Sequence, residues 1–347
     1  MAYHLLNGLV VYSSLDLCVI VLNNGRLSKE IKKLGIRTYV LNEKKLSFLN
    51  ILLTVHKILS KDPPDIIHSH RYKENILAYL TSRFIPCIKL ISTQHGMPEI
   101  HEGKPNVKHL LISRSNFFML SHYFHKVVGV SQDIQKAFIK GYGFKEEKAS
   151  FIRNGIEIPK TLPKSYISKI FTIGSSGRLF PIKDYTLMIE IAKIVSGKSK
   201  NVRFILAGDG PERNKLQSLI LKYGLHKSFI LIGHKENMDD FYKDLDLYIN
   251  TSIHEGIPMS ILEAMSYDLP VIAPNVGGIS EIIDDGVEGY LIDSRNPNHF
   301  AERCIRLFKN RQLRAKMSQA VREKVIKEFS MEQMAEKYYN LYRSIAK

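Results

Sequence analysis

The stretch NTSIHEGIPMSILEAMSYDLPVIAPNVGG, residues 250–278, places two glutamates in largely apolar surroundings. Its middle predicts a helix over residues 258–267 with Glu263 at its centre, and Glu255 stands just ahead of the first turn. Strand-like runs on both sides make this a strand–helix–strand unit of a parallel sheet. Ligands of such units lie at the carboxyl ends of the strands, beside helix N-termini. Because a buried carboxylate needs a partner, we expect the two glutamates to hold a ligand. An exposed glutamate on an amphipathic helix is the ordinary alternative.

The same alternation of strand and helix extends through the whole chain. The strand-like runs are, in order, LCVIVL, TYVL, DIIHSH, KLISTQH, KVVGVS, ASFIRNG, FTIGSSG, RFILAGDG, SFILIGH, LYINTS, PVIAPN and GYLID. Helical patterns of 10 to 20 residues separate most of them, which is typical of α/β folds with parallel sheets. We therefore predict an α/β fold class.

The alternation stops at NGIEIPKTLPKSYISK, residues 154–169, which is rich in proline, lysine and serine. Such a composition is typical of linkers. We predict two doubly wound Rossmann-like domains, an N-terminal one at residues 1–158 and a C-terminal one at 170–329, joined by a linker at 159–169. The final segment, residues 330–347, predicts an amphipathic helix capped by Ser330, for which packing against the first domain is one option.

Composition narrows the possible classes of protein. The chain has 347 residues, a formal net charge of +16 and three widely separated cysteines. Neither a disulfide framework nor a zinc site is indicated, so we expect a reducing, cytoplasmic setting. The one apolar N-terminal segment, residues 4–22, has no preceding basic residues and no cleavage site. It fits a helix followed by a buried strand better than a signal peptide or a membrane span.

Positive charge is concentrated in the first half, where residues 1–158 hold 22 lysines and arginines against 12 acidic residues. This suits an anionic partner such as a membrane surface, a phosphorylated substrate or nucleic acid, although general solubility is an alternative explanation. No motif that interleaves basic and aromatic residues is present, so we expect no nucleic-acid partner.

One candidate anion site follows the strand-like run at the start of FTIGSSGRLFPIKDYTLMIEIAKIV, residues 171–195. Small residues at a strand-to-helix turn, here Gly174 and Gly177, let backbone N–H groups approach an anion. Arg178 and Lys183, five residues apart, could clamp a diphosphate, the arginine through two parallel bonds and the lysine as a point charge. The P-loop and G-x-G-x-x-G patterns are both absent.

Two more stretches follow strands of the same half of the chain. Gly208 and Gly210 in FILAGDGPERNKLQSLI are explained by tight turn geometry alone. The start of the helix that carries Glu263, with Pro258 in its first turn, offers an anion four backbone N–H groups, those of Gly256, Ile257, Met259 and Ser260. A carboxylate accepts hydrogen bonds from both hydroxyls of a vicinal diol. Two cations, a helix N-terminus and two carboxylates therefore suit a phosphorylated polyol such as a nucleotide sugar.

These stretches resemble the C-terminal domain of retaining glycosyltransferases of the GT-B fold, family 4 (glycosyltransferase group 1). The resemblance rests on GRLFPIKDYTLMIEIAKIV, FILAGDGPERNKL, the two glutamates eight positions apart and AMSYDLPVIAPNVGGISEIIDDGVEGYLID, in this order and spacing. It implies the GT-B fold, in which two Rossmann-like domains face each other across a cleft. It also implies that Arg178 and Lys183 bind the donor diphosphate, that Glu263 holds the donor ribose hydroxyls, and that Glu255 lies by the donor sugar.

The N-terminal half resembles the acceptor domain of the same family, through DIIHSHRYKENILAYL and KLISTQHGMPE. In that family a histidine follows a strand at the interdomain cleft, near the donor sugar and the acceptor, and His95 occupies this place. A lone histidine is more often an ordinary core or surface residue. His68 and His70 also end a strand and are candidates to line the cleft.

The start of the chain departs from the family. Relatives begin with a strand and a glycine-rich loop before their first helix, whereas this sequence begins inside that helix, at MAYHLLNGLVVYSS. The expectation is that a central first strand, and a loop that shapes the site, are missing. An inactive, N-terminally truncated homologue is then one alternative.

Other functions can be weighed against these residues. A metal-dependent transferase of the other fold type would need an Asp-x-Asp motif, and Asp244 and Asp246 supply the letters, but they end a helical stretch and are expected at the surface. A nucleotide-sugar epimerase shares the GT-B architecture, and Glu255 with His95 leaves that alternative open.

Together, residues and resemblance predict glycosyl transfer with retention, from a nucleoside diphosphate sugar to a glycan or lipid-linked acceptor. Arg178, Lys183 and the helix start would stabilise the charge on the leaving diphosphate, so neither a metal nor a cofactor is expected. We expect a role in surface polysaccharide or lipopolysaccharide biosynthesis. Peripheral binding to anionic membranes is expected through the basic, aromatic segment 108–126, on the inner face of the cell membrane.

Overall fold

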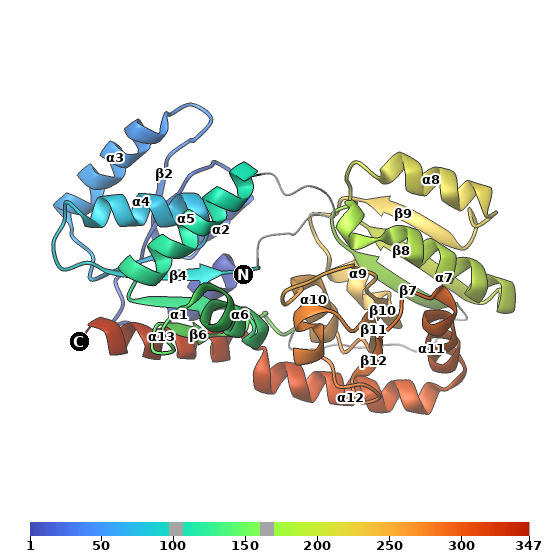
Figure 1. Cartoon of the computed structure of the whole chain (residues 1–347). Coiled ribbons are helices and arrows are strands. Elements are labelled where there is room, and N and C mark those ends of the chain that lie inside the picture. Colours follow the sequence, from blue (N-terminus) through green and yellow to red (C-terminus); the bar gives the residue numbers. More distant parts are fainter. Residues whose placement is uncertain (97–106, 160–169, 347) are drawn as a thin grey trace. The chain divides into compact units, whose positions relative to one another are not determined.

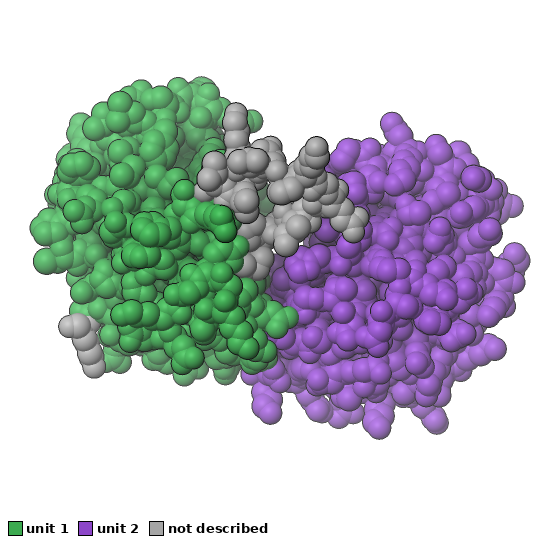
Figure 2. Space-filling model, viewed as in Figure 1, with its two compact units in different colours: residues 1–155, 331–347 green, residues 156–330 purple. Residues whose placement is uncertain are grey.

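The computed structural model describes residues 1–96, 107–159 and 170–346, and the side chains of residues 107–111 lie outside this description. The chain forms two compact units (Figure 2), each described here by itself. Unit 1 comprises Met1–Gly155 together with Met331–Lys347, and unit 2 comprises Ile156–Ser330. The predicted linker, apart from Pro159, falls outside the described residues.

Unit 1 contains parallel strands grouped in two sheets. The strands are β1 (Cys18–Val21), β2 (Arg37–Val40), β3 (Ile66–Ser69), β4 (Lys89–Gln94), β5 (Lys126–Gly129) and β6 (Ala149–Phe151). Within the described residues, β1 and β2 form one sheet, and the other has the order β3-β4-β5-β6. In β1, Cys18 is exposed and the other three residues are half-buried. The sequence expectation of a buried strand was therefore wrong for β1, which among the described residues pairs with β2 alone.

Helices pack on these sheets (Figure 1). They are α1 (Ala2–Leu9), α2 (Arg26–Lys33), α3 (Phe48–Lys61), α4 (Tyr72–Ser82), α5 (Val107–Tyr123), α6 (Gln132–Tyr142) and α13 (Met331–Ala346). The last of these comes from the far end of the chain and packs along α1. Their shared core includes Leu5, Leu9, Met334 and Tyr338. Ser330 itself forms a bridge with Ile156, and the helix begins at the next residue.

Unit 2 is built on one sheet of parallel strands. They are β7 (Phe171–Ser176), β8 (Val202–Ala207), β9 (Phe229–Gly233), β10 (Leu247–Ile249), β11 (Val271–Pro274) and β12 (Gly289–Ile292). Among the described residues the order is β12-β11-β10-β7-β8-β9. The order reverses between β7 and β10, so these two strands lie side by side at the switch point of a doubly wound sheet, where such folds bind ligands.

The helices of unit 2 cover this sheet (Figure 1). They are α7 (Tyr185–Lys198), α8 (Arg213–Lys222), α9 (Asp239–Lys243), α10 (Met259–Ser266), α11 (Pro297–Lys309) and α12 (Arg311–Glu328), with short 3₁₀ turns at Pro181–Lys183 and Gly277–Glu281. Helix α7 contacts both α8 and α11, and α10 contacts α12. Strands β7, β10 and β11 are buried along their whole length, as expected for central strands covered on both faces.

All twelve strand-like runs of the sequence contain a strand, and every recorded pairing between them is parallel. The predicted α/β class is confirmed. The helix predicted over 258–267 is α10, which is one residue shorter at each end.

Candidate active site

The loops after β7 and β10 meet at the carboxyl edge of the unit 2 sheet, because the two strands are hydrogen-bonded neighbours. Ile253 N donates to Ile182 O at 2.8 Å, and the Thr251 hydroxyl donates to Lys183 O at 3.0 Å. The β7 loop carries Lys183 and the β10 loop carries Glu255. Two candidate residues 72 positions apart in sequence are thus brought into one site.

Glycines allow further loops to approach this edge. Gly208 and Gly210 have positive φ angles, and a Cβ on Gly210 would lie 2.6 Å from the carbonyl oxygen of Leu179. A Cβ on Gly208 would collide with the carbonyl of Gly177. Turn geometry alone was therefore an incomplete interpretation, because the second function of these glycines is close packing of the β8 loop on the β7 loop. A Cβ on Gly277 would likewise collide with the carbonyl of Glu255.

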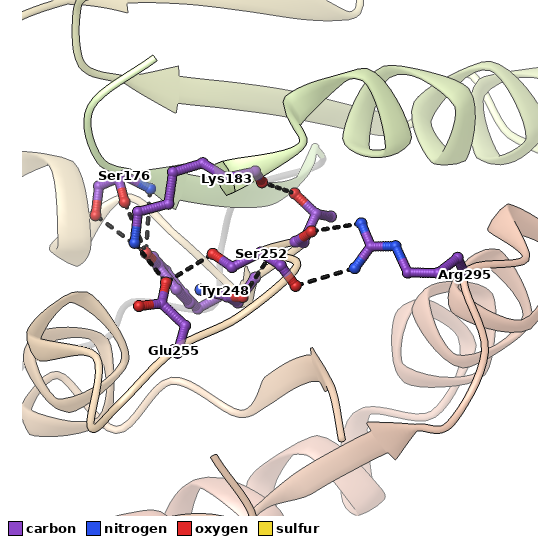
Figure 3. A network of polar contacts seen from close by, with 8 residues as sticks. Ser176, Lys183, Tyr248, Ser252, Glu255 and Arg295 are labelled. Atoms are coloured by element: carbon purple, nitrogen blue, oxygen red, sulfur yellow. Dashed lines mark hydrogen bonds and ion pairs between the residues drawn. The ribbon is translucent and has the colours of Figure 1, made fainter. Parts of the chain in front are cut away.

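Lys183 and Glu255 form an ion pair through Glu255 Oε1, which also accepts a hydrogen bond from the Ser252 hydroxyl at 2.6 Å (Figure 3). Their side chains are 21% and 11% exposed, so solvent screens the pair only partly. An ammonium group has three N–H donors. Lys183 can therefore hold Glu255 and still offer donors to an anion at the mouth of the loop.

Glu263, on α10, has a partner within the protein. Its Oε2 accepts a hydrogen bond from the Tyr242 hydroxyl at 2.7 Å, and Tyr242 continues to Ser176 Oγ at 3.0 Å. Ser176 Oγ in turn lies 3.1 Å from the Tyr248 hydroxyl (Figure 3). Burial raises the pKa of Glu263, and the bond from Tyr242 offsets part of that rise. Tyr242 is thus a partner of this carboxylate within the protein, which sequence reasoning did not identify.

The start of α10 has no side-chain cap. Its N-cap is Pro258, for which no side-chain capping bond is present, and the first N–H groups of a helix have no intrahelical acceptor. Ile257 and Pro258 are buried, whereas Gly256, Met259 and Ser260 are half-buried. Glu255 therefore directly precedes the uncapped start of this helix.

Arg178 lies on the same β7 loop as Lys183 but is exposed, with its guanidinium 5.0 Å from the centre of the Phe180 ring. Arg178 and Lys183 thus lie on the same loop, and both side chains are at least partly exposed to solvent. The structure does not bring Arg178 into the ion pair of Lys183 and Glu255.

In unit 1, His95 follows β4 and joins a cluster of rings. His70 Nδ1 lies 3.3 Å from His95 Nε2, and the ring centres of His68 and His70 are 4.4 Å apart. His68 bonds through Nδ1 to the Tyr342 hydroxyl at 2.7 Å, and through Nε2 to Thr93 at 2.8 Å. All three histidine candidates are therefore grouped at the ends of β3 and β4, beside α13.

Burial is the main influence on the protonation of these rings. It lowers the pKa of His68 to about 3 and lowers that of His70 well below its ordinary value. The pKa of His95, which keeps an exposed face, is also lowered, first by burial and then by nearby positive charge. Neutral imidazoles are favoured at pH 7, and each can both donate and accept one hydrogen bond.

The two aspartates of the Asp-x-Asp pattern lie at the end of α9 and at the start of β10. Asp244 is exposed at the end of α9, and Asp246 accepts a hydrogen bond from Thr172 N at 2.9 Å, which ties the start of β10 to β7. Among the described residues, no cluster of three histidine, cysteine, aspartate or glutamate side chains has the arrangement of a metal site. Over the same residues, none of the helices combines the length and apolar character needed to cross a bilayer.

Sequence reasoning missed three groups at the unit 2 edge. Ser176 ends β7 as a small polar residue at a strand terminus, a signal that could have identified it. Tyr242 lies on the short helix α9, and nothing local distinguishes it. Arg295, after β12, donates to Asp184 and to two carbonyls of the β10 loop. Its only sequence signal was a cation shortly after a strand.

Comparison with known proteins identifies the family of the chain. The model of Glycosyltransferase Family 4 matches residues 5–159, and that of Glycosyl transferases group 1 matches residues 161–324. A UDP-Gal:alpha-D-GlcNAc-diphosphoundecaprenol alpha-1,3-galactosyltransferase of Escherichia coli is 25% identical over 91% of this chain and 84% of its own length. An N-acetyl-alpha-D-glucosaminyl L-malate synthase of Bacillus anthracis is 28% identical over 83% of this chain and 77% of its own.

Solved structures extend the likeness to the fold. The crystal structure of Anabaena HepE in complex with UDP-glucose superposes with a TM-score of 0.84 at 21% identity, covering 98% of this chain and 95% of HepE. The two family models together cover nearly all of the chain. The chain therefore belongs to the group 1 glycosyltransferases of the GT-B fold.

Proposed function

We propose that this glycosyltransferase moves a sugar, with retention, from a nucleoside diphosphate sugar to a glycan or lipid-linked acceptor. The observation that carries the proposal is the Lys183–Glu255 pair, held at the carboxyl edge of β7 and β10 directly before the open start of α10. A cation and a helix N-terminus suit the diphosphate, and a carboxylate beside them suits sugar hydroxyls.

The proposed roles of these groups follow from the negative charge that develops on the leaving diphosphate during transfer. In the oxocarbenium-like transition state, the bond from the anomeric carbon to the diphosphate lengthens and negative charge grows on the leaving oxygen. Lys183, Arg178 and the backbone from Gly256 to Ser260 would stabilise that charge, so the reaction would proceed without a metal or cofactor. Glu255 would contact the donor sugar.

We propose two further roles, one for a residue of each unit. Glu263 would accept hydrogen bonds from the ribose hydroxyls with the oxygen that Tyr242 leaves free, since only Oε2 is engaged. His95 would act near the donor sugar and the acceptor, as a neutral imidazole.

Donor and acceptor classes are suggested by the relatives. The E. coli relative is by name a UDP-Gal transferase acting on a diphosphoundecaprenol-linked sugar, and the Anabaena structure holds UDP-glucose. We propose a UDP-sugar as the first donor to test and a polysaccharide precursor as acceptor, used on the cytoplasmic side of the membrane. Because the E. coli relative is by name a galactosyltransferase, the comparisons do not favour an epimerase.

A donor panel tests the proposal. UDP-, GDP- and ADP-sugars are incubated with the purified chain, with and without EDTA, and released nucleotide is measured. Release from at least one donor, unchanged by EDTA, is expected, and the product anomer is read by NMR with a glycan or lipid acceptor. An inverted anomer would refute retention. Conversion of the donor sugar into its epimer without release of nucleotide would identify an epimerase.

We also propose peripheral binding of unit 1 to anionic membranes. The segment 108–126 is only partly suited to this, because on α5 Phe117 and Leu120 are buried while Ile112 and Phe118 are exposed. Helix α3 offers a second surface, with exposed Phe48, Leu49 and Leu53 and no acidic residue. Apolar side chains beside lysines are typical of helices that lie in the lipid interface.

Vesicle sedimentation checks this partner. Binding to anionic vesicles that weakens with salt is expected, and Leu49→Glu should reduce it. Leu221→Glu, at an equally exposed leucine on α8 (59% against 62%), is the matched control and should leave binding unchanged. Equal, salt-independent binding to neutral and anionic vesicles would contradict the proposal.

A further inference from the structure

Arg295 joins two loops of the unit 2 site. It follows β12 and precedes α11, and its guanidinium has three acceptors (Figure 3). Nη1 donates to the carbonyl of Ser252 at 2.9 Å, Nη2 donates to the carbonyl of Thr251 at 2.7 Å, and Nη2 also forms an ion pair with the Asp184 carboxylate. One side chain thus bonds to the β7 loop and the β10 loop at once.

These acceptors stand next to the Lys183–Glu255 pair. Asp184 directly follows Lys183, and the Ser252 hydroxyl donates to Glu255 at 2.6 Å. The Thr251 hydroxyl donates to the carbonyl of Lys183. Arg295 is therefore one residue removed from each member of the ion pair.

Asp184 itself is held in an unusual conformation. Its φ of 43° and ψ of 56° are left-handed, a region that non-glycine residues adopt rarely. One carboxylate oxygen accepts from Leu187 N at 3.3 Å, which caps α7, and the other meets Arg295. Arg295 thereby contributes to the backbone turn that directs the Lys183 side chain.

The contacts require a guanidinium group. Thr251 and Ser252 are each 1% exposed, so carbonyls there need a donor from the protein. A planar guanidinium presents five N–H groups in a fixed fork and can serve two carbonyls and a carboxylate together, whereas an ammonium is a compact point charge. The Arg295 side chain is 39% exposed, so solvent screens its ion pair with Asp184. Its bonds to the two buried carbonyls therefore contribute more to holding the loops together than the ion pair does.

We propose that Arg295 is a positioning residue for glycosyl transfer, which fixes the geometry of Lys183 and Glu255 without touching the donor. This rests on the function proposed above. Because a misplaced Lys183 would lose contact with charge that grows only in the transition state, replacing Arg295 should lower kcat more than it raises KM.

The test compares Arg295→Lys and Arg295→Gln with the same changes at Arg314. The Arg314 guanidinium also donates to two carbonyls, those of Leu307 and Phe308, but at the end of α11. Donor-hydrolysis kinetics and thermal melting are measured on the full chain. We expect kcat of Arg295→Lys to fall about 10-fold or more, with KM changed less. Arg314→Lys should lose comparable thermal stability and keep the wild-type kcat.

A second readout does not depend on turnover. The rate at which an amine-specific reagent modifies Lys183 is followed by peptide mass spectrometry. Release of Lys183 from its pair should make labelling several-fold faster in Arg295→Gln than in wild type, with no change in Arg314→Gln.

Each outcome bears on one proposal. Wild-type kcat together with an unchanged Lys183 labelling rate in Arg295→Gln would overturn the positioning role. So would equal losses of kcat in the Arg295 and Arg314 variants, which would indicate general destabilisation. If the wild-type chain hydrolyses no donor, the proposed function fails, whereas the labelling comparison still decides whether Arg295 positions Lys183.

Discussion

At the scale of single residues, the main feature of the unit 2 site is the partly buried ion pair of Lys183 and Glu255. Lys183 and Glu255 lie 72 positions apart in the sequence and form an ion pair whose side chains are only 21% and 11% exposed. Removing one member of such a pair leaves the other charge without its main partner, which costs more than the pair itself contributes. Function and stability are therefore linked at these two side chains.

The ion pair gives a double-mutant prediction. Lys183→Ala and Glu255→Ala should each destabilise the fold by about 1 to 3 kcal/mol, because each leaves a partly buried charge poorly paired. The double variant should lose less than the sum, with a coupling of about 0.5 to 3 kcal/mol. Denaturant unfolding measures all three, and strict additivity would contradict the pairing. Lys183→Ala should also lower kcat/KM about 100-fold.

Glu263 gives a pH prediction. Burial raises the pKa of Glu263 in the folded chain, so the folded state holds this proton more tightly than the unfolded state does. Stability from this group is then present at pH below the ordinary glutamate value and is lost as pH rises through the raised value. Glu263→Gln, which can still accept from Tyr242, should raise the melting temperature at pH 7.5 relative to wild type. It should also abolish most donor turnover.

The advantage of Glu263→Gln should shrink as pH falls below the ordinary glutamate pKa, where the wild-type carboxyl is protonated in both states. Glu302→Gln, at an exposed position on α11, serves as the control and should show no such pH-dependent gain. A Glu263→Gln variant that melts below wild type at pH 7.5 would refute the assigned cost of burying this charge.

At the scale of elements, α13 is part of unit 1 although it ends the chain. It packs on α1 so closely that a Cβ on Gly8 would lie 2.6 Å from Ala335 Cβ. Tyr338 and Tyr342 extend from the same helix to Thr93 and His68. The helix therefore supports both the core of unit 1 and the histidine cluster.

Two identical substitutions test this packing. Gly8→Ala should destabilise unit 1 by about 1 to 3 kcal/mol, because the added methyl group overlaps Ala335. Gly197→Ala, near the end of α7, meets open space and should stabilise by about 0.5 to 1 kcal/mol, because alanine loses less backbone entropy in a helix. Thermal melting of the two variants should shift in opposite directions. A stabilising Gly8→Ala would disprove the close contact of α1 and α13.

At the scale of the whole molecule, the chain passes between its units at residues 155/156 and again at 330/331 (Figure 2). Unit 2 is continuous in sequence, and its sheet and core lie within Ile156–Ser330. Unit 1 depends on a distant segment, since α13 contributes Met334, Ala335 and Tyr338 to its core.

This asymmetry predicts how fragments behave. Residues 156–330 alone should melt cooperatively and bind UDP, because the described residues of their main core cluster all lie within this range. Residues 1–155 alone should not melt cooperatively, because they expose the apolar surface that α13 covers, and adding a peptide of residues 331–347 should restore order. Calorimetry decides both points. Cooperative melting of 1–155 without the peptide would contradict the structural role of α13.

Local patterns were sufficient for the elements and for the positions of the candidate residues. Apolar runs bounded by glycine and polar residues located the strands of the described residues, and for β7, β10 and β11 the physical reason is burial on both faces, which leaves a continuous apolar signal. The placement of Lys183, Glu255 and Glu263 on strand-to-helix connections followed from the same patterns. Strands of a parallel sheet all point one way, so these residues had to share one edge.

Only the tertiary structure decided which of these groups meet. The Lys183–Glu255 pair exists because β7 lies beside β10, and strand order is set by the packing of whole elements, which no local pattern encodes. For the same reason, the sequence did not identify Tyr242 as the partner of Glu263. Nor did it identify the bond between Arg295 and Asp184, which are 111 positions apart. Sequence by itself determined which chemical groups stand at the sheet edge. The fold decided their partners, because hydrogen bonds and ion pairs depend on distance in space rather than along the chain.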